Sequence, residues 1–177
     1  RKARSLRVVV NDSPLVVHDR LQGRLQHSLH EQTGDFIVRR ADRLVAYQLA
    51  VVVDDAEQGI THIVRGADLL DSTPRQVHLQ QLLGYARLDY THLPVAANLA
   101  GEKLSKQTRA RHIEAGNPAA TLRDALEFLR QPLPEEPQQA SLDELWQWAI
   151  AHWAPDSIPR RRSLPAPAAW LDDAAPV

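Results

Sequence analysis

The sequence contains no cysteine among its 177 residues. Disulfide bridges and metal sites built on thiolates are therefore excluded for this chain, and the absence fits a reducing compartment. No apolar run approaches the roughly 20 residues that a membrane-spanning helix needs, and no signal peptide opens the sequence. We therefore expect a cytoplasmic protein with no membrane among its partners.

Methionine is also absent, and the sequence begins with Arg1. Because an open reading frame begins with methionine, we expect further sequence upstream. An excess of one charge is lacking too, since 21 basic residues face 22 acidic ones. That balance gives no global basic field of the kind that marks many nucleic-acid-binding proteins, although a local patch would suffice for RNA.

The residues that are present predict an α/β fold class. Short β-branched runs bounded by turn residues predict strands at 6–10, 15–18, 36–39, 60–64 and 92–96. The run 44–53 is almost continuously apolar, so its periodicity leaves a buried strand and a buried helix both open. Leucines at helical spacing predict a helix over 74–86, with Thr73 as its N-cap.

The last third of the chain changes character. After a polar loop at 98–107, residues 121–130 predict one helix. Ser141 and Glu144 form a capping box that opens a second helix through Trp153. The tail from residue 155 onward is rich in proline and alanine and predicts an extended strap or partial disorder. A small helical unit is therefore expected to follow the α/β segment.

The most informative short motif is Lys103-Leu104-Ser105-Lys106-Gln107, which places two lysines three apart in the polar loop. Such a loop can bring two cationic charges onto triphosphate oxygens and stabilise the charge that develops on a departing pyrophosphate. A solvated basic loop without a catalytic role explains the same motif, so the motif alone does not identify an ATP site. Its meaning depends on the sequence upstream.

Upstream, three ordered blocks resemble the active-site segment of glutamyl-tRNA synthetases, which are class I enzymes. The blocks are Tyr47 with an apolar run ending in Val53-Asp54-Asp55, then Gly59-Ile60-Thr61-His62 with Arg65-Gly66, then Asp71-Ser72-Thr73-Pro74-Arg75-Gln76. The lysine motif falls where that family places its Lys-Met-Ser-Lys-Ser loop. The resemblance covers roughly residues 5–130.

The resemblance implies the C-terminal part of a class I aminoacyl-tRNA synthetase catalytic domain of Rossmann type, followed by a small helical unit. It divides the chain into 1–107, the second part of the catalytic domain, 108–154, a stem-like helical unit, and 155–177, the tail. Residues 108–177 are too few for the large anticodon-binding region of full-length glutamyl-tRNA synthetases. They fit the truncated paralogues of that family, the glutamyl-Q tRNA(Asp) synthetases.

That subgroup implies an ATP-dependent ligase that activates glutamate to glutamyl-adenylate and transfers it to the queuosine base in the anticodon of tRNA(Asp). The implied partners are glutamate, ATP with Mg²⁺ and tRNA(Asp), and the protein is expected to be a monomer. Two alternatives stay open. The chain could be a fragment of a glutamyl-tRNA synthetase that charges tRNA(Glu), or a non-catalytic RNA-binding relative.

Residue roles follow from the same resemblance. Tyr47 matches the family tyrosine that contacts glutamate, and Arg65 matches an arginine that binds it, since a guanidinium grips a carboxylate with two parallel hydrogen bonds. Lys103 opens the signature loop and Lys106 contacts ATP, so both are assigned to catalysis. The alternatives are structural, namely a half-buried aromatic side chain filling the core for Tyr47 and a surface salt bridge at a strand end for Arg65.

The sequence departs from the family pattern in two ways. The His-containing glycine-rich turn of the nucleotide site is missing, since residues 24–29 lack glycines, and the cysteine-based zinc site is missing as well. Zinc is therefore possible only through residues upstream, and no metal ligand is assigned in this chain. Asp54 and Asp55 could hold Mg²⁺, but at a helix end beside Arg65 a role as structural partners or caps is favoured. With part of an active site, this chain alone is expected not to activate glutamate.

Overall fold

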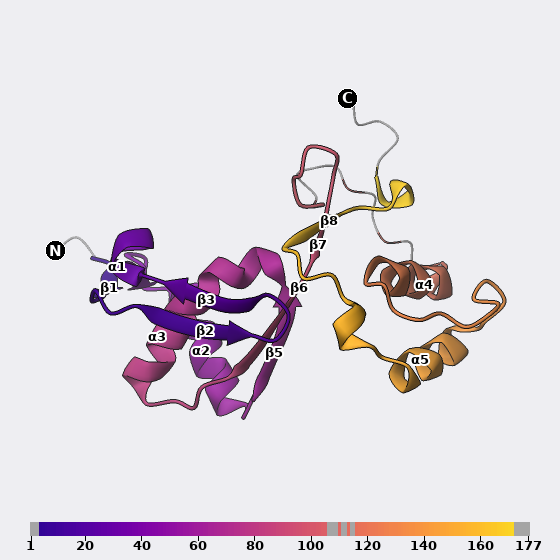
Figure 1. Ribbon diagram of the computed structural model, residues 1–177. Helices are drawn as coiled ribbons and strands as arrows, with labels where there is room; N and C mark the ends of the chain where they lie inside the picture. Colours follow the sequence, from indigo (N-terminus) through magenta and orange to yellow (C-terminus); the bar gives the residue numbers. More distant parts are fainter. Residues whose placement is uncertain (1–3, 106–109, 111–112, 114–115, 172–177) are drawn as a thin grey trace. The chain divides into compact units, whose positions relative to one another are not determined.

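The computed structural model describes residues 4–105, 110, 113 and 116–171 of the 177. The chain divides into two compact units, Arg1–His92 and Leu93–Val177. Figure 1 shows both units with most of their helices and strands labelled. The region predicted at 1–107 therefore contributes to both units, because the division comes before the lysine loop.

A four-stranded sheet is the centre of the first unit. Its strands are β2 (Leu15–Asp19), β3 (Gly23–His27), β5 (His62–Gly66) and β6 (Asp89–Leu93), in the order β3-β2-β6-β5. β2 and β3 form an antiparallel hairpin, whereas β6 joins β2 in parallel, with Asp19 opposite Tyr90. The order matters because it lays β2, β6 and β5 side by side.

Helices and a small second sheet complete the first unit. α2 (Tyr47–Glu57) packs on α3 (Thr73–Leu83), and the 3-10 helix η1 (Ala67–Ser72) leads directly into α3. β1 (Leu6–Val8) pairs antiparallel with β4 (Phe36–Arg39), and the one-turn helix α1 (Leu29–Gln32) precedes β4. The strands predicted in this unit are confirmed with shifts at their ends, and β3 was not predicted.

The core of the first unit explains the open choice at 44–53. Val17 from β2, Val52 from α2 and Val77 from α3 are only 1%, 2% and 1% exposed. Full burial of such a side chain contributes about 1.5–3 kcal/mol. The apolar run forms a helix because this places Val52 in the core and Leu49 against it. Gly59, with φ +67°, allows the chain to turn after α2.

The predicted N-cap of α3 is wrong. Ser72 occupies the cap without a side-chain hydrogen bond to the helix, and Thr73 is the first helical residue. The physical reason is that η1 precedes α3 without a break, so the Thr73 N–H already donates to the Leu70 carbonyl. The Thr73 hydroxyl is thereby left for other partners. Gly84, with φ +70°, ends α3 at Leu83, before the predicted end.

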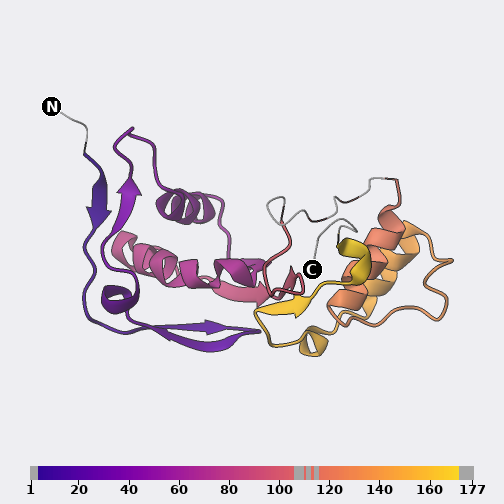
Figure 2. The same cartoon turned by 90° about the horizontal axis from the view of Figure 1, so that it is seen from above.

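The second unit pairs two short strands and packs two helices. β7 (Val95–Ala97) lies parallel to β8 (Ser163–Pro165), and α4 (Pro118–Phe128) packs on α5 (Leu142–Ala151), side by side in Figure 1 and Figure 2. The capping box is confirmed, since the Ser141 hydroxyl accepts from the Glu144 N–H and the Glu144 carboxylate accepts from the Ser141 N–H. Pro94 divides the strand predicted at 92–96 into β6 and β7, because proline cannot donate to a ladder.

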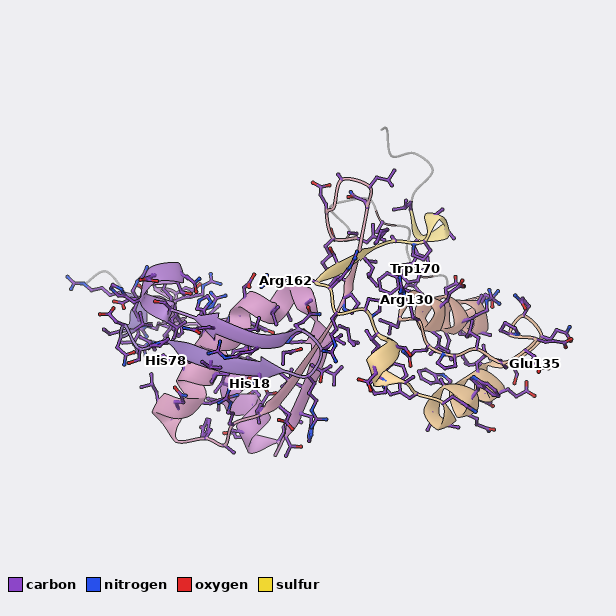
Figure 3. The ribbon with its side chains drawn as sticks, in the orientation of Figure 1. His18, His78, Arg130, Glu135, Arg162 and Trp170 are labelled. Carbon is purple, nitrogen blue, oxygen red and sulfur yellow. The ribbon has the colours of Figure 1, made fainter. Side chains whose placement is uncertain are left out.

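The proline-rich tail is in part a strap, as its composition predicted. After β8, the Ala166 N–H donates to the Ala97 carbonyl at 2.8 Å. Trp170 of η3 (Ala168–Trp170) packs on Phe128 of α4 with 5.2 Å between the ring centroids, and Figure 3 shows its place beside the helix. Across the described ranges, none of the helices is long and apolar enough to cross a membrane.

Candidate functional site

Three hydrogen bonds hold the Arg65 side chain, which projects from β5. Its Nε donates to His92 Nε2 at 3.0 Å, and its Nη2 donates to Thr73 Oγ1 at 2.9 Å and to Gln76 Oε1 at 2.7 Å. A guanidinium has five N–H groups, so these bonds leave the two on Nη1. Within the part of the chain that the structure describes, Nη1 has no hydrogen-bond partner.

These hydrogen bonds limit how Arg65 can bind a carboxylate, for which the sequence predicts two parallel hydrogen bonds. Two parallel hydrogen bonds require neighbouring N–H groups on two nitrogens. Since Nε and Nη2 of Arg65 are occupied, an incoming carboxylate meets Nη1 first. It gains a second parallel bond only where Gln76 gives up its contact with Nη2.

The acceptor for Arg65 Nε is the ring of His92, on β6, which is fully buried. Its other nitrogen, Nδ1, lies 2.6 Å from Asp19 Oδ2. An arginine N–H can only donate, so His92 Nε2 must be an acceptor and the ring carries its proton on Nδ1. His92 is therefore a neutral imidazole that donates to Asp19.

Asp19 ends β2 with a buried carboxylate whose Oδ1 is also fully used. It accepts from the backbone N–H groups of Leu21 at 3.0 Å, Gln22 at 2.8 Å and His92 at 3.3 Å. Burial alone raises the pKa of the Asp19 carboxyl, but the hydrogen bonds from the His92 side chain and from these N–H groups together hold the pKa below its usual value. Asp19 therefore remains an anion at neutral pH.

A second line of side chains continues from Arg65 toward α2. Gln76 Nε2 donates to Gln48 Oε1 at 2.9 Å, and Gln48 Nε2 donates to the Ser72 hydroxyl at 3.1 Å. Each amide accepts on one side and donates on the other, so the line fixes the orientation of both glutamines. It connects Arg65 to the first turn of α2, next to Tyr47.

The Tyr90 ring faces the guanidinium of Arg65 at 5.6 Å, which is a cation–π contact. Burial lowers the pKa of Arg65, while Tyr90, Tyr47, Asp55 and Asp19 act in the opposite direction. The guanidinium stays protonated, since arginine is not deprotonated in proteins. The site is thus a fixed, partly desolvated positive charge.

Tyr47 is the first residue of α2, and its side chain is 54% exposed. Contact with glutamate and the structural alternative of a half-buried aromatic side chain both stay predictions for this residue. Its neighbour in α2, Gln48, is linked to Arg65 through Gln76. Among the described residues the Tyr47 hydroxyl has no hydrogen-bond partner, so it can donate to a ligand.

The lysine loop lies in the second unit and follows β7. Lys103 forms an isolated bridge with Ala97, and the Leu104 N–H donates to the Ala96 carbonyl at 2.8 Å. Gly101, with φ +81°, allows the turn that brings the chain back along β7. Lys106 and Gln107 lie outside the described residues. Since Arg65 and Lys103 belong to different units, the structure assigns them no common geometry.

Asp54 and Asp55 lie in the last turns of α2. Burial and the neighbouring Asp54 raise the pKa of Asp55, whereas Arg65 lowers it. The interpretation of Asp55 as an electrostatic partner of Arg65 is consistent with this coupling. Over the described residues, no group of three or more His, Cys, Asp or Glu side chains could hold a metal ion.

Sequence reasoning missed most of the groups that hold Arg65. His92, Thr73 and Gln76 accept directly from Arg65, while Asp19 and Gln48 act through His92 and Gln76. Two signals were present in the sequence, namely a histidine inside an otherwise strand-like run at 92 and an aspartate directly before a turn at 19. Neither signal names its partner, because the contacts depend on the order of the strands.

Comparison with known proteins finds curated relatives that are similar over most of this chain. Glutamyl-Q tRNA(Asp) synthetase from Dechloromonas aromatica is 54% identical over 168 residues, which are 95% of this chain and 56% of that protein. The protein of the same name from Thiobacillus denitrificans is 52% identical over 166 residues, 94% of this chain and 55% of its own length. The chain thus spans about half the length of the curated relatives it matches.

Among solved structures, the glutamate-tRNA synthetase from Elizabethkingia anophelis superposes with a TM-score of 0.67 at 20% identity, covering 90% of this chain and 35% of that one. That likeness confirms the predicted α/β catalytic fold. The sequence also matches the family model described as tRNA synthetases class I (E and Q), catalytic domain, over residues 1–130. Because this match covers most of its length, the chain belongs to the family of class I tRNA synthetase (E and Q) catalytic domains.

Proposed function

We propose that the protein containing this chain is an ATP-dependent ligase that activates glutamate and transfers it to the queuosine base of tRNA(Asp). Two relatives above 50% identity carry the name glutamyl-Q tRNA(Asp) synthetase. The observation that carries the proposal is Arg65, whose Nη1 has no hydrogen-bond partner among the described residues and which lies in the same unit as the exposed Tyr47.

The chemistry follows from these groups. Arg65 and Tyr47 bind glutamate and orient it, while its α-carboxylate oxygen attacks the α-phosphorus of ATP. A carboxylate–phosphorus bond forms, the bond to the bridging oxygen breaks, and pyrophosphate leaves with the electron pair. A hydroxyl of the acceptor base then attacks the adenylate carbonyl and releases AMP. Positioning and charge stabilisation supply the catalysis, so the protein needs no nucleophile of its own.

Lys103 and Lys106 are assigned to the departing pyrophosphate. An ammonium group neutralises charge on phosphate oxygens as that charge grows, which lowers the barrier to the first step. Magnesium usually binds through substrate phosphates with one or two carboxylates, so it would arrive with ATP. This assignment predicts that Lys103→Ala lowers kcat for adenylate formation more than it changes the KM for glutamate.

The acceptor and the activity of the isolated chain are tested together. The natural protein that contains this sequence is supplied with radioactive glutamate, ATP and either tRNA(Asp) bearing queuosine or tRNA(Glu). We expect label on tRNA(Asp) and resistance of that label to removal of the 3′-terminal adenosine. Label that leaves with the 3′ end of tRNA(Glu) would identify a glutamyl-tRNA synthetase instead, and ATP binding without label on either tRNA would contradict transfer.

A parallel assay uses the 177-residue chain by itself. Glutamate-dependent ATP–pyrophosphate exchange is expected from the natural protein and not from the isolated chain, since the residues of the nucleotide-binding turn are not in this sequence. Substantial exchange by the chain alone would contradict that expectation.

A further inference from the structure

We infer that Asp19 and His92 are positioning residues that hold Arg65 in its glutamate-binding orientation, an inference that rests on the proposed function. The three side chains come from adjacent strands, Asp19 from β2, His92 from β6 and Arg65 from β5. They form one hydrogen-bonded line across the sheet, with contacts of 2.6 Å and 3.0 Å.

The hydrogen bonds of this line all run from donor to acceptor in one direction, from Arg65 to Asp19. The Arg65 Nε–H donates to His92, the His92 Nδ1–H donates to Asp19, and Asp19 accepts backbone N–H groups through its other oxygen. No member can reverse its role, because arginine cannot accept and a carboxylate cannot donate. The Asp19 carboxylate therefore determines which nitrogen of the imidazole is free to accept from Arg65.

Burial strengthens the dependence of the His92 proton position on Asp19. The side chains of His92 and Asp19 are both 0% exposed, so water cannot replace a lost partner. Thr73 Oγ1 lies 3.2 Å from the same His92 Nε2 and also accepts from Arg65 Nη2. Thr73 therefore contacts both partners of the Arg65–His92 hydrogen bond. The result is a guanidinium with one nitrogen, Nη1, left for a ligand.

The Asp19→Asn variant tests this arrangement with almost no change in shape. The amide oxygen takes the place of Oδ1, which accepts backbone N–H groups, so the amide nitrogen faces His92 Nδ1. Because this nitrogen is a donor, the imidazole must carry its proton on Nε2 so that Nδ1 can accept the hydrogen bond. Nε2 then opposes the Arg65 Nε–H as donor against donor at 3.0 Å. We expect the KM for glutamate to rise about 10- to 100-fold while the KM for ATP stays unchanged. Loss of a hydrogen bond that orients a metal-binding side chain has an effect of this size.

Two variants of His92 separate positioning from support of the fold. In His92→Gln the amide oxygen can reach the place of Nε2 and still accept from Arg65, whereas in His92→Asn the amide nitrogen can reach the place of Nδ1 and still donate to Asp19. Positioning of Arg65 predicts that His92→Gln keeps the lower KM for glutamate. A purely structural role predicts the reverse, because only His92→Asn keeps the buried carboxylate paired.

The assay is ATP–pyrophosphate exchange by the natural protein, with glutamate and ATP varied separately. Asp89→Asn is the matched control, since Asp89 also lies on this sheet but pairs with Arg20 at the surface and is 56% exposed. Its KM values are expected to match those of the unmodified protein. In an Arg65→Ala background, Asp19→Asn should have no further effect on the KM for glutamate, since the two substitutions act on one contact.

The possible failures are distinguishable. If Arg65→Ala leaves the KM for glutamate unchanged, the proposed role of Arg65 fails. If Arg65→Ala raises that KM but Asp19→Asn does not, or if His92→Asn binds glutamate at least as well as His92→Gln, then the positioning inference is overturned. A rise in both KM values for Asp19→Asn, still present in the Arg65→Ala background, would overturn it as well.

Discussion

The two units hold their functional side chains by opposite means. In the first unit, Arg65 is fixed by partners from another strand and from α3, between 8 and 27 residues away in sequence. In the second unit, the approach to Lys103 is shaped within a few residues, where Asn98 accepts from the N–H groups of Ala100 and Glu102. A rigid binding group thus depends on the whole fold of its unit, whereas the loop depends on a local turn.

Tryptophan and tyrosine residues are divided between the two units. All four tryptophans, at 146, 148, 153 and 170, lie in the second unit, and all three tyrosines, at 47, 85 and 90, lie in the first. Tryptophan fluorescence therefore reports on the second unit alone. Unfolding of the second unit can be followed through this signal.

The largest effect is expected at Arg65. Arg65→Ala should lower kcat/KM for glutamate about 1000-fold, which corresponds to about 4 kcal/mol, because a charged partner of the carboxylate is lost and buried acceptors at His92 and Gln76 are left unpaired. Arg65→Lys keeps the charge but cannot serve three acceptors in one plane, so it should restore little of the activity. Recovery close to the unmodified level by Arg65→Lys would contradict the geometric argument.

The next largest effect concerns stability in the second unit. Leu145 on α5 is 0% exposed, so Leu145→Ala should destabilise by about 2–5 kcal/mol through lost burial and a residual cavity. Ile150 on the same helix is 76% exposed, and Ile150→Ala should change stability by less than about 0.5 kcal/mol. Urea unfolding followed by tryptophan fluorescence measures both. Amide exchange at Val17 and Val77 should be unaffected if the units unfold independently.

Local signals were the part of the fold that sequence predicted well. β4 has its predicted bounds, and the capping box at Ser141 forms as its spacing indicates. The missed strand β3 has two charged or polar residues in its middle, and its pairing with β2 outweighs that weak propensity. A strong local pattern is therefore visible in a sequence, whereas a strand of weak propensity such as β3 is revealed only by its pairing with a neighbouring strand.

The candidate site divides in the same way. Resemblance to a known family selected Tyr47 and Arg65, and the structure brings both into the first unit. It could not select Asp19 or His92, because their roles depend on β6 lying between β2 and β5. Parallel pairing of strands about 70 residues apart follows from packing and not from any local pattern.

A pH effect is expected for the buried carboxylate of the first unit. The folded pKa of Asp19 lies below its usual value, so its stabilising contribution is fully present above the ordinary aspartate pKa and is lost as pH falls through the lower folded value. At pH 7, Asp19→Asn should reduce the free energy of unfolding by about 1.5–3 kcal/mol. Urea unfolding followed by far-UV circular dichroism should show this difference shrinking toward pH 3. A difference that stays constant with pH would contradict the assigned charge state.

The smallest effect is expected at the cap of α5 and isolates local stabilisation. Ser141→Ala removes the side-chain acceptor for the Glu144 N–H, which should lower the stability of the second unit by about 1 kcal/mol. Ser157→Ala is the control, because Ser157 is exposed and its hydroxyl has no hydrogen bond among the described residues, so the change should be below about 0.5 kcal/mol. Tryptophan fluorescence resolves the two. Since the capping contact spans three residues and touches no other element, Ser141→Ala should leave the KM for glutamate unchanged, and a rise in that KM would show that the second unit's helices support the Arg65 site after all.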